Sequence, residues 1–209
     1  MSVLPNRDRQ AERREATRRE ILDAAWDLAH EHGIAGFTLR DIAARVGMQA
    51  PSLYSHFPSK TAIYDAMFGE AWAAYLAVVE EMTAEVQRHP QPPRQLLKTI
   101  ATHFFDFAVA DPERFQLMNV RVLHGFTPSP EAYAPSIAVY EAARAQLVAL
   151  GATRDEDLDL YASIVGGLCE GQISNDLGGT RYRRLLDRAM DMYADDLGLP
   201  RPRPTKGKR

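Results

Sequence analysis

The chain has 209 residues, the length of one large domain or of a small domain joined to a larger one. A hydrophobic share of 45% predicts a packed core, and a formal net charge of −3 lacks the basic excess that is typical of nucleic-acid-binding domains. The longest apolar run, residues 71–79, is too short to span a membrane, and the single Cys169 excludes an internal disulfide, so we expect a cytoplasmic protein.

Apolar residues recur at spacings of three and four along the chain, and no segment alternates convincingly with a period of two. This pattern predicts an all-α protein. The first helix is expected to begin at Glu12 or Glu15 and to end at His32, with residues 1–13 forming a flexible basic arm.

Two short helices are expected next. Thr38 begins the first, with Asp41 three positions on in a capping-box relation, and Gly47 ends it. Pro51 suits the first turn of the second helix, because its missing N–H would have no partner there. Two short helices joined by a glycine-containing turn pack at a steep angle, which leaves the second helix at the surface.

The longer helices follow. The apolar spacing predicts them over residues 59–88, 94–110, 112–121, 134–150, 155–177 and 180–197. The clearest interruption lies at residues 89–93, which contain three prolines. Residues 199–209 have little to bury and are expected to form a disordered basic tail.

The second short helix is unusual in its outward face. With Leu53 and Phe57 buried, it presents hydrogen-bonding side chains that carry almost no charge: Gln49, Ser52, Tyr54, Ser55 and His56. A helix that enters the major groove of DNA needs such groups, since Gln pairs with adenine and Ser reaches bases or phosphates. The attraction by charge is then expected from nearby basic residues: Arg40, Arg45, Lys60, Arg13, Arg14, Arg18 and Arg19.

Three motifs in this region stand at fixed spacing. They are F-T-x-x-x-I-A-x-x-x-G at residues 37–47, L-Y-x-H-F at 53–57 and P-S-K at 58–60. Together they resemble the N-terminal DNA-binding domain of TetR-type transcriptional regulators, and the resemblance covers about the first third of the chain. It implies an all-α fold, with a three-helix helix-turn-helix domain over residues 14–74 (motif 38–57) and a larger helical effector-binding and dimerisation domain over residues 75–198.

The resemblance also implies a function. The chain would be a homodimer that binds a palindromic operator in double-stranded DNA, as a repressor released by a small-molecule effector; an activator is the alternative within this class. By analogy, phosphate contacts would come from Thr38, Tyr54, His56 and Lys60. The residues near base edges would be Arg40, Gln49, Pro51 and Ser52.

The C-terminal two thirds offer candidate effector residues, although these side chains also suit an ordinary core. Helical bundles place ligand sites between their helices. The aromatic and sulfur-containing candidates for such a pocket are Trp72, Tyr75, Phe104, Phe107, Met118, Tyr140, Tyr161 and Cys169.

Three glycines, Gly166, Gly167 and Gly171, lie within one expected helix. They do not form a phosphate-binding loop, because no Lys-Ser/Thr pair follows them. Small residues let another helix approach closely, and in the family the last two long helices pair with those of a second subunit. We therefore expect the dimer interface within residues 155–197.

Two other classes of protein were weighed. An all-α enzyme would need a nucleophile with its base, a metal constellation or a cofactor loop, and the sequence shows none, so no cofactor or metal is expected. A helical adaptor without DNA binding is the other alternative. The net charge of −3 does not exclude DNA binding, because it is the sum of +1 over residues 1–60, −9 over residues 61–200 and +5 over residues 201–209.

Overall fold

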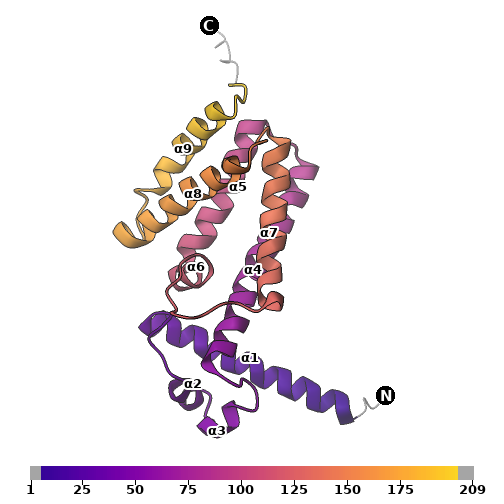
Figure 1. Cartoon of the computed structure of the whole chain (residues 1–209), viewed down its shortest axis with the longest axis vertical. Coiled ribbons are helices and arrows are strands. Elements are labelled where there is room, and N and C mark those ends of the chain that lie inside the picture. Colours follow the sequence, from indigo (N-terminus) through magenta and orange to yellow (C-terminus); the bar gives the residue numbers. More distant parts are fainter. Residues whose placement is uncertain (1–5, 202–209) are drawn as a thin grey trace. The chain divides into compact units, whose positions relative to one another are not determined.

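The computed structural model describes residues 6–201, and every regular element among them is an α-helix (Figure 1). The predicted all-α fold is confirmed for this part of the chain. The helices are α1 (Asn6–His32), α2 (Leu39–Arg45), α3 (Ala50–Leu53), α4 (Lys60–Arg88), α5 (Pro93–Ala110), α6 (Pro112–Asn119), α7 (Pro130–Ala149), α8 (Asp155–Asn175) and α9 (Arg183–Asp196). None of the helices within residues 6–201 is long and apolar enough to cross a membrane.

Most helix ends lie close to the predicted positions, but α1 is longer than expected. It begins at Asn6, so residues 6–13, predicted as part of a flexible arm, are helical. The sequence of α1 contains no Gly or Pro and consists mostly of Ala, Arg, Glu and Leu, which favour helix and let it extend beyond the packed part. Residues 1–5 of the predicted arm lie outside the described residues.

The chain forms two compact units, and each combines two separate stretches of sequence. The first unit comprises residues 1–72 and 113–135, and the second comprises residues 73–112 and 136–209. The division within α4 lies close to the predicted boundary after residue 74. The predicted second domain included residues 113–135, whereas in the structure α6 and the segment that follows it group with the first unit.

The core of the first unit explains this assignment. Side chains from α1, α2, α3, α4 and the segments that connect them form one buried cluster, which includes Ile21, Leu28, Phe37, Ile42, Leu53, Phe57, Ile63 and Met67. Leu117 of α6 joins the cluster, and Phe126 packs against it. The ring centroid of Phe126 lies 6.1 Å from that of Tyr64 and 6.2 Å from that of Phe68. Residues 113–135 therefore complete the apolar surroundings of α4.

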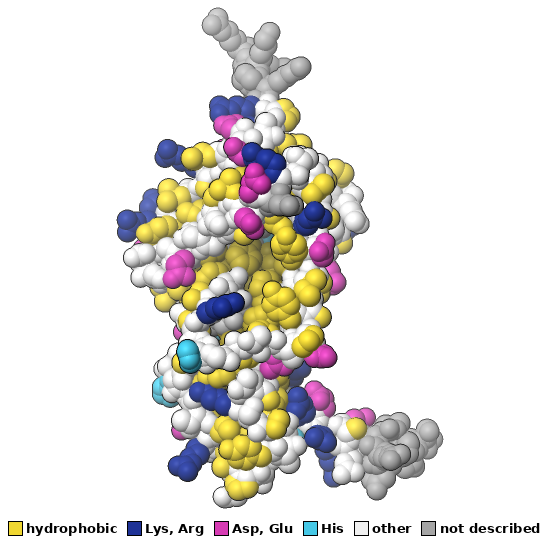
Figure 2. Space-filling model, viewed as in Figure 1, with side chains coloured by type: hydrophobic (Ala, Val, Ile, Leu, Met, Phe, Trp, Pro, Cys, Tyr) yellow, Lys and Arg dark blue, Asp and Glu magenta, His cyan; other side chains and the backbone are white. Residues whose placement is uncertain are grey.

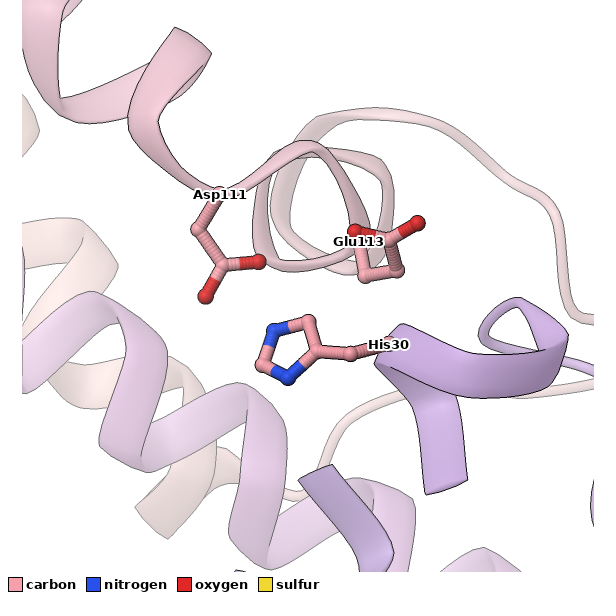
Figure 3. A group of neighbouring side chains, drawn as sticks. All are labelled: His30, Asp111 and Glu113. Carbon is pink, nitrogen blue, oxygen red and sulfur yellow. The ribbon is translucent and has the colours of Figure 1, made fainter. Parts of the chain in front are cut away.

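Polar contacts also join α6 to α1. The guanidinium carbon of Arg114 lies 5.8 Å from the centroid of the Trp26 ring. A ring nitrogen of His30 and a carboxylate oxygen of Glu113 lie within 4.8 Å of each other (Figure 3). Both pairs belong to the first unit, and they fix α6 beside the C-terminal half of α1.

The first turn of α7 is held on α4. Asp65 accepts hydrogen bonds from the Ser129 amide (2.6 Å) and hydroxyl (2.7 Å), and the Ser129 hydroxyl oxygen accepts one from the Ala132 amide at 3.2 Å. A Cβ atom at Gly69 would lie 3.3 Å from Cα of Ala132, so glycine permits this close approach. In consequence α7 starts at Pro130, earlier than the predicted residue 134.

The second unit is built around α5, which packs against both α8 and α9 (Figure 1). The buried residues of α9 are Leu186, Met190, Tyr193 and Ala194, spaced as one face of a helix. The Tyr193 hydroxyl donates to the carbonyl of Asp157 at 2.8 Å, so this buried polar group is satisfied.

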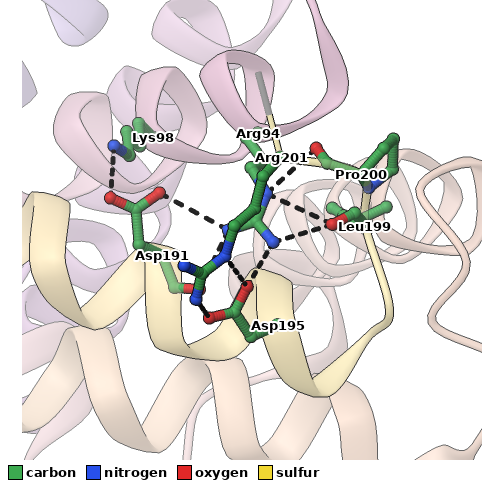
Figure 4. Close-up of polar contacts among 7 residues, drawn as sticks. All are labelled: Arg94, Lys98, Asp191, Asp195, Leu199, Pro200 and Arg201. Carbon is green, nitrogen blue, oxygen red and sulfur yellow. Dashed lines mark hydrogen bonds and ion pairs between the residues drawn. The ribbon is translucent and has the colours of Figure 1, made fainter. Parts of the chain in front are cut away.

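A buried arginine closes the C-terminal end of this unit. The side chain of Arg94 on α5 is only 8% exposed. Its guanidinium donates to three backbone carbonyls, at 3.2 Å to Asp191, 2.7 Å to Leu199 and 3.1 Å to Pro200, and also to the carboxylate of Asp195 (Figure 4). A buried charge needs such partners, and here the chain end supplies them.

Two further cations surround this cluster. Lys98 donates to Asp191 at 2.8 Å, and Arg201 pairs with Asp195 (Figure 4). Hydrogen bonds from Arg201 and Arg94 lower the pKa of Asp195 to about 2. The disordered tail was predicted to start at residue 199, but residues 199–201 are held by these contacts, and residues 202–209 lie outside the described part.

Candidate nucleic-acid interface

The start of α2 is fixed by the predicted capping box. The Asp41 carboxylate accepts from the Thr38 amide at 2.7 Å and from the Thr38 hydroxyl at 2.8 Å, while the Asp41 amide donates back to that hydroxyl oxygen at 3.3 Å. These hydrogen bonds lower the pKa of Asp41. The Thr38 hydroxyl, predicted to contact phosphate, is therefore part of the cap in the DNA-free chain, at an exposed position.

The turn between α2 and α3 sets the direction of α3. Gly47 has a φ of 69°, a left-handed conformation that strains other residues. The next amide, that of Met48, donates to the Ala43 carbonyl at 2.8 Å and closes the end of α2. Gln49 then precedes α3 as its N-cap residue, and its side chain makes no capping hydrogen bond.

The face of α3 is divided as predicted between buried and exposed residues. Leu53 is fully buried and Phe57 is 1% exposed. On the outer side Gln49, Pro51 and Ser52 are exposed, and Tyr54 is 53% exposed. Figure 2 shows the surface at the α2–α3 end as mainly hydrophobic and uncharged, with few acidic side chains. This arrangement offers hydrogen-bonding groups without electrostatic repulsion of phosphates.

His56 differs from the other predicted contacts. It is half-buried, and its Nδ1 atom is buried without a hydrogen-bond partner among the described residues. His56 lines a hollow together with Arg13, Arg14 and Thr17 of α1, a neighbourhood that the spacing within residues 50–57 does not reveal.

Several cations near this face are engaged by the chain itself. Arg45 forms a bidentate pair with Glu31, with N–O distances of 3.0 and 2.6 Å. Lys60 donates to the carbonyls of Phe37 and Ala35, and its ammonium lies 4.7 Å from the centroid of the Phe37 ring. Burial lowers the pKa of Lys60.

Arg40 is different, because it is exposed and has neither an ion pair nor a side-chain hydrogen bond among the described residues. The predicted sources of positive charge are thus divided into bound and unbound groups. Arg19, for example, pairs with Glu70 at 2.5 Å.

From the sequence, Arg14 and Arg18 were predicted only as sources of positive charge near the DNA. Arg14 and Arg18 of α1 donate to the carbonyls of Ser55 and His56, at the end of the segment that contains α3. Their spacing in the sequence could have indicated these contacts, since Arg14 and Arg18 precede Ile21 with helical spacing and so continue the buried face of α1.

The predicted effector residues fall into two groups. In the second unit, the ring of Tyr75 lies 5.2 Å from that of Phe104 and 4.9 Å from that of Phe107. Cys169 is fully buried, and burial raises the pKa of its thiol to about 12. The hydroxyl of Tyr161 is buried without a hydrogen-bond partner among the described residues.

The other three predicted effector residues lie elsewhere. Trp72 and Met118 belong to the first unit, where Met118 lines a hollow of about 300 Å³ with Phe68 and Tyr133. Tyr140 is 50% exposed and lines a small surface hollow of about 40 Å³. Two of the eight residues thus belong to the first unit and six to the second, and Tyr140 is exposed; aromatic composition alone does not reveal which face of a helix is covered.

The three glycines of α8 also separate. A Cβ atom at Gly171 would lie 2.5 Å from the Tyr182 ring, so the space beside it is filled by the same chain. Around Gly166 and Gly167, no atom of the described residues beyond the neighbouring residues and the nearby backbone of α8 lies within 4 Å of the corresponding Cβ position. Of the three glycines, these two therefore have open space beside them.

The geometry thus defines a helix-turn-helix unit joined to a second helical unit. Residues 21–67 match a family model described as "Bacterial regulatory proteins, tetR family". This match agrees with the resemblance that the motifs at residues 37–60 carry.

Known proteins show the same pattern. Over 72 residues, the chain is 39% identical to the tetracycline repressor protein class A from transposon 1721 of Escherichia coli, covering 34% of this chain and 28% of the repressor. Over 105 residues, it is 30% identical to the HTH-type transcriptional regulator AcrR of Shigella flexneri, covering 50% and 47% of the two chains. The matches thus span less than half the length of these curated relatives.

A solved structure extends the likeness in fold. The chain superposes on the transcriptional regulator FadR from Bacillus subtilis, solved in complex with stearoyl-CoA, with a TM-score of 0.61 and 14% sequence identity. The superposition covers 84% of this chain and 97% of FadR.

Proposed function

We propose that the chain is a transcriptional regulator that binds a specific site in double-stranded DNA through α3. The observation that carries this proposal is the exposed, uncharged, hydrogen-bonding face of α3. It is mounted on the buried Leu53 and Phe57 and lies within the segment that matches the tetR family. Gln49 and Ser52 would read base edges, and Tyr54 would donate to a phosphate.

The active form in this proposal is a homodimer. Leu185 and Met192 are 43% and 64% exposed and lie two turns apart on α9, away from its buried face. On α8, Leu160 is 43% exposed and the space beside Gly167 is open. Exposed apolar side chains on two neighbouring helices suit a self-complementary interface, and a two-fold dimer would place two copies of α3 on a palindromic operator.

The proposed effector is a small molecule bound by the second unit. Tyr75, Phe104 and Phe107 supply aromatic surface, and the unsatisfied hydroxyl of Tyr161 offers a buried hydrogen-bonding group. The solved complex of FadR with stearoyl-CoA supports a ligand in a protein of this fold. An effector that binds better to the DNA-free arrangement would release the operator, as in a repressor.

Fluorescence anisotropy with a duplex from the DNA upstream of the chain's own coding sequence tests the proposal. We expect saturable binding that weakens steeply with salt and that exceeds binding to a scrambled duplex by at least about 10³-fold. Gln49→Ala should change base preference, while Tyr54→Phe should weaken binding to all sequences alike. Equal affinity for the two duplexes would refute the proposal.

A further inference from the structure

The carbonyl groups at the end of the α3 segment have unusual partners. Helical N–H groups are lacking there, and Pro58, which follows, has no N–H to offer. Instead Arg14 donates to the Ser55 carbonyl at 3.2 Å, and Arg18 donates to the His56 carbonyl at 2.5 Å. Two side chains of α1 therefore take the place of the missing backbone donors.

Arg18 is held on a second side. Its guanidinium carbon lies 4.1 Å from the centroid of the Phe57 ring, which is 1% exposed. The Glu15 carboxylate is farther away, with an N–O distance of 3.9 Å. A planar guanidinium that stacks on a ring and donates to the adjoining carbonyl fixes both groups relative to α1.

Arg13 provides a contrast on the same helix. It is exposed, and its side chain has neither an ion pair nor a hydrogen bond among the described residues. It borders an open hollow of about 390 Å³ that is also lined by Arg14, Ser55 and His56. Neighbouring arginines of α1 are thus in different situations, one unbound and one attached to the α3 segment.

We propose that Arg14 and Arg18 are positioning residues for DNA recognition, which hold the C-terminal end of the α3 segment, whereas Arg13 contacts the phosphates directly. The proposal rests on the DNA-binding function proposed above. The two roles differ in their dependence on salt. Each phosphate contact contributes about −0.9 to the slope of log K against log salt concentration, and a positioning residue contributes nothing to it.

The test compares an Arg14→Lys/Arg18→Lys double variant with an Arg13→Gln variant in the full chain. The affinity of each variant is measured over a range of salt concentrations for two duplexes of the same length. One is a duplex that the unmodified chain has selected from a random library, and the other is a scrambled version of it. The double variant keeps its positive charges but replaces the planar guanidinium groups with ammonium groups. We expect it to lose about tenfold in affinity for the selected duplex and little for the scrambled one, with an unchanged salt slope.

Arg13→Gln should give the opposite pattern. It should weaken binding to both duplexes by the same factor and reduce the salt slope by about 1.8, because the proposed dimer carries two copies of Arg13. Because Arg13 lies beside Arg14, a general effect of altering α1 would appear in both variants. A loss of discrimination in the double variant alone, and a reduced salt slope in Arg13→Gln alone, would distinguish positioning of the α3 segment from direct phosphate contact.

Amide hydrogen exchange supplies a readout without DNA. Exchange at residues 54–57 should be faster in the double variant than in the unmodified chain, and unchanged in Arg13→Gln. Thermal unfolding checks that the variants are folded. Should the double variant not fold, Arg14→Lys alone, at an exposed position, is measured in the same way.

Three results would overturn the inference. The first is a double variant that discriminates the two duplexes as well as the unmodified chain does, which would leave the proposed DNA-binding function standing. The second is a salt slope that falls for Arg14→Gln/Arg18→Gln by about 3.6, the change expected for four phosphate contacts in the dimer. The third is unchanged exchange at residues 54–57. An unmodified chain without sequence preference would instead refute the proposed function.

Discussion

Replacing Arg94 tests whether the buried arginine holds the C-terminal end of α9. In Arg94→Met the carbonyls of Leu199, Pro200 and Asp191 lose their donor. The carboxylates of Asp191 and Asp195 are 48% and 40% exposed, so water replaces part of what they lose. We therefore expect a loss of about 2–3 kcal/mol, below the ~3–5 kcal/mol for breaking a fully buried pair.

Urea and thermal unfolding, followed by circular dichroism, measure this change. For a chain of this length the melting temperature should fall by about 4–12 °C. Arg201→Ala is the matched control, because Arg201 shares Asp195 but is 76% exposed, and it should cost clearly less than Arg94→Met. Equal losses for the two variants, or a loss for Arg94→Met below about 0.5 kcal/mol, would refute the role of burial at Arg94.

The remaining predictions concern packing, turn geometry and pH. Gly171→Val should destabilise the chain, since its Cβ would meet the Tyr182 ring, whereas Gly167→Val should weaken dimers in sedimentation velocity and lower the melting temperature only through the lost dimer; the reverse order would contradict the assignment. Gly47→Ala should cost about 1–2 kcal/mol in urea unfolding, because Gly47 has a positive φ, and a neutral effect would argue against this turn. The depressed pKa of Asp195 stabilises the fold above its unfolded pKa of about 4, and this contribution should disappear as the pH falls toward 2; Asp195→Asn should show a smaller acid-induced loss in pH-dependent unfolding.

The local features of the first unit could be predicted from sequence because their signals are local. Thr38 and Asp41 form the capping box that their spacing predicts, and Leu53 and Phe57 are buried as their shared face requires. In both cases the interacting groups lie within one or two helical turns.

Other features depend on contacts between distant parts of the chain. Phe126 packs on Tyr64 and Phe68, and no periodicity within residues 113–135 reveals that partner. The sequence pattern of α5 suggests an exposed position for Arg94, and its burial depends on contacts with residues 191–200. The division of the effector candidates between the two units could not be predicted for the same reason, since the sequence shows aromatic side chains but not the helices that cover them.

The discontinuous composition of the first unit bears on how this chain can be divided or recombined. A fragment that ends at Trp72 contains α1, α2, α3 and part of α4, but lacks Leu117 and Phe126. The faces of Tyr64 and Phe68 that they cover would then meet water and favour aggregation. A chimera that transfers DNA recognition to another effector unit must therefore carry residues 113–135 together with residues 1–72, or supply an apolar surface in their place.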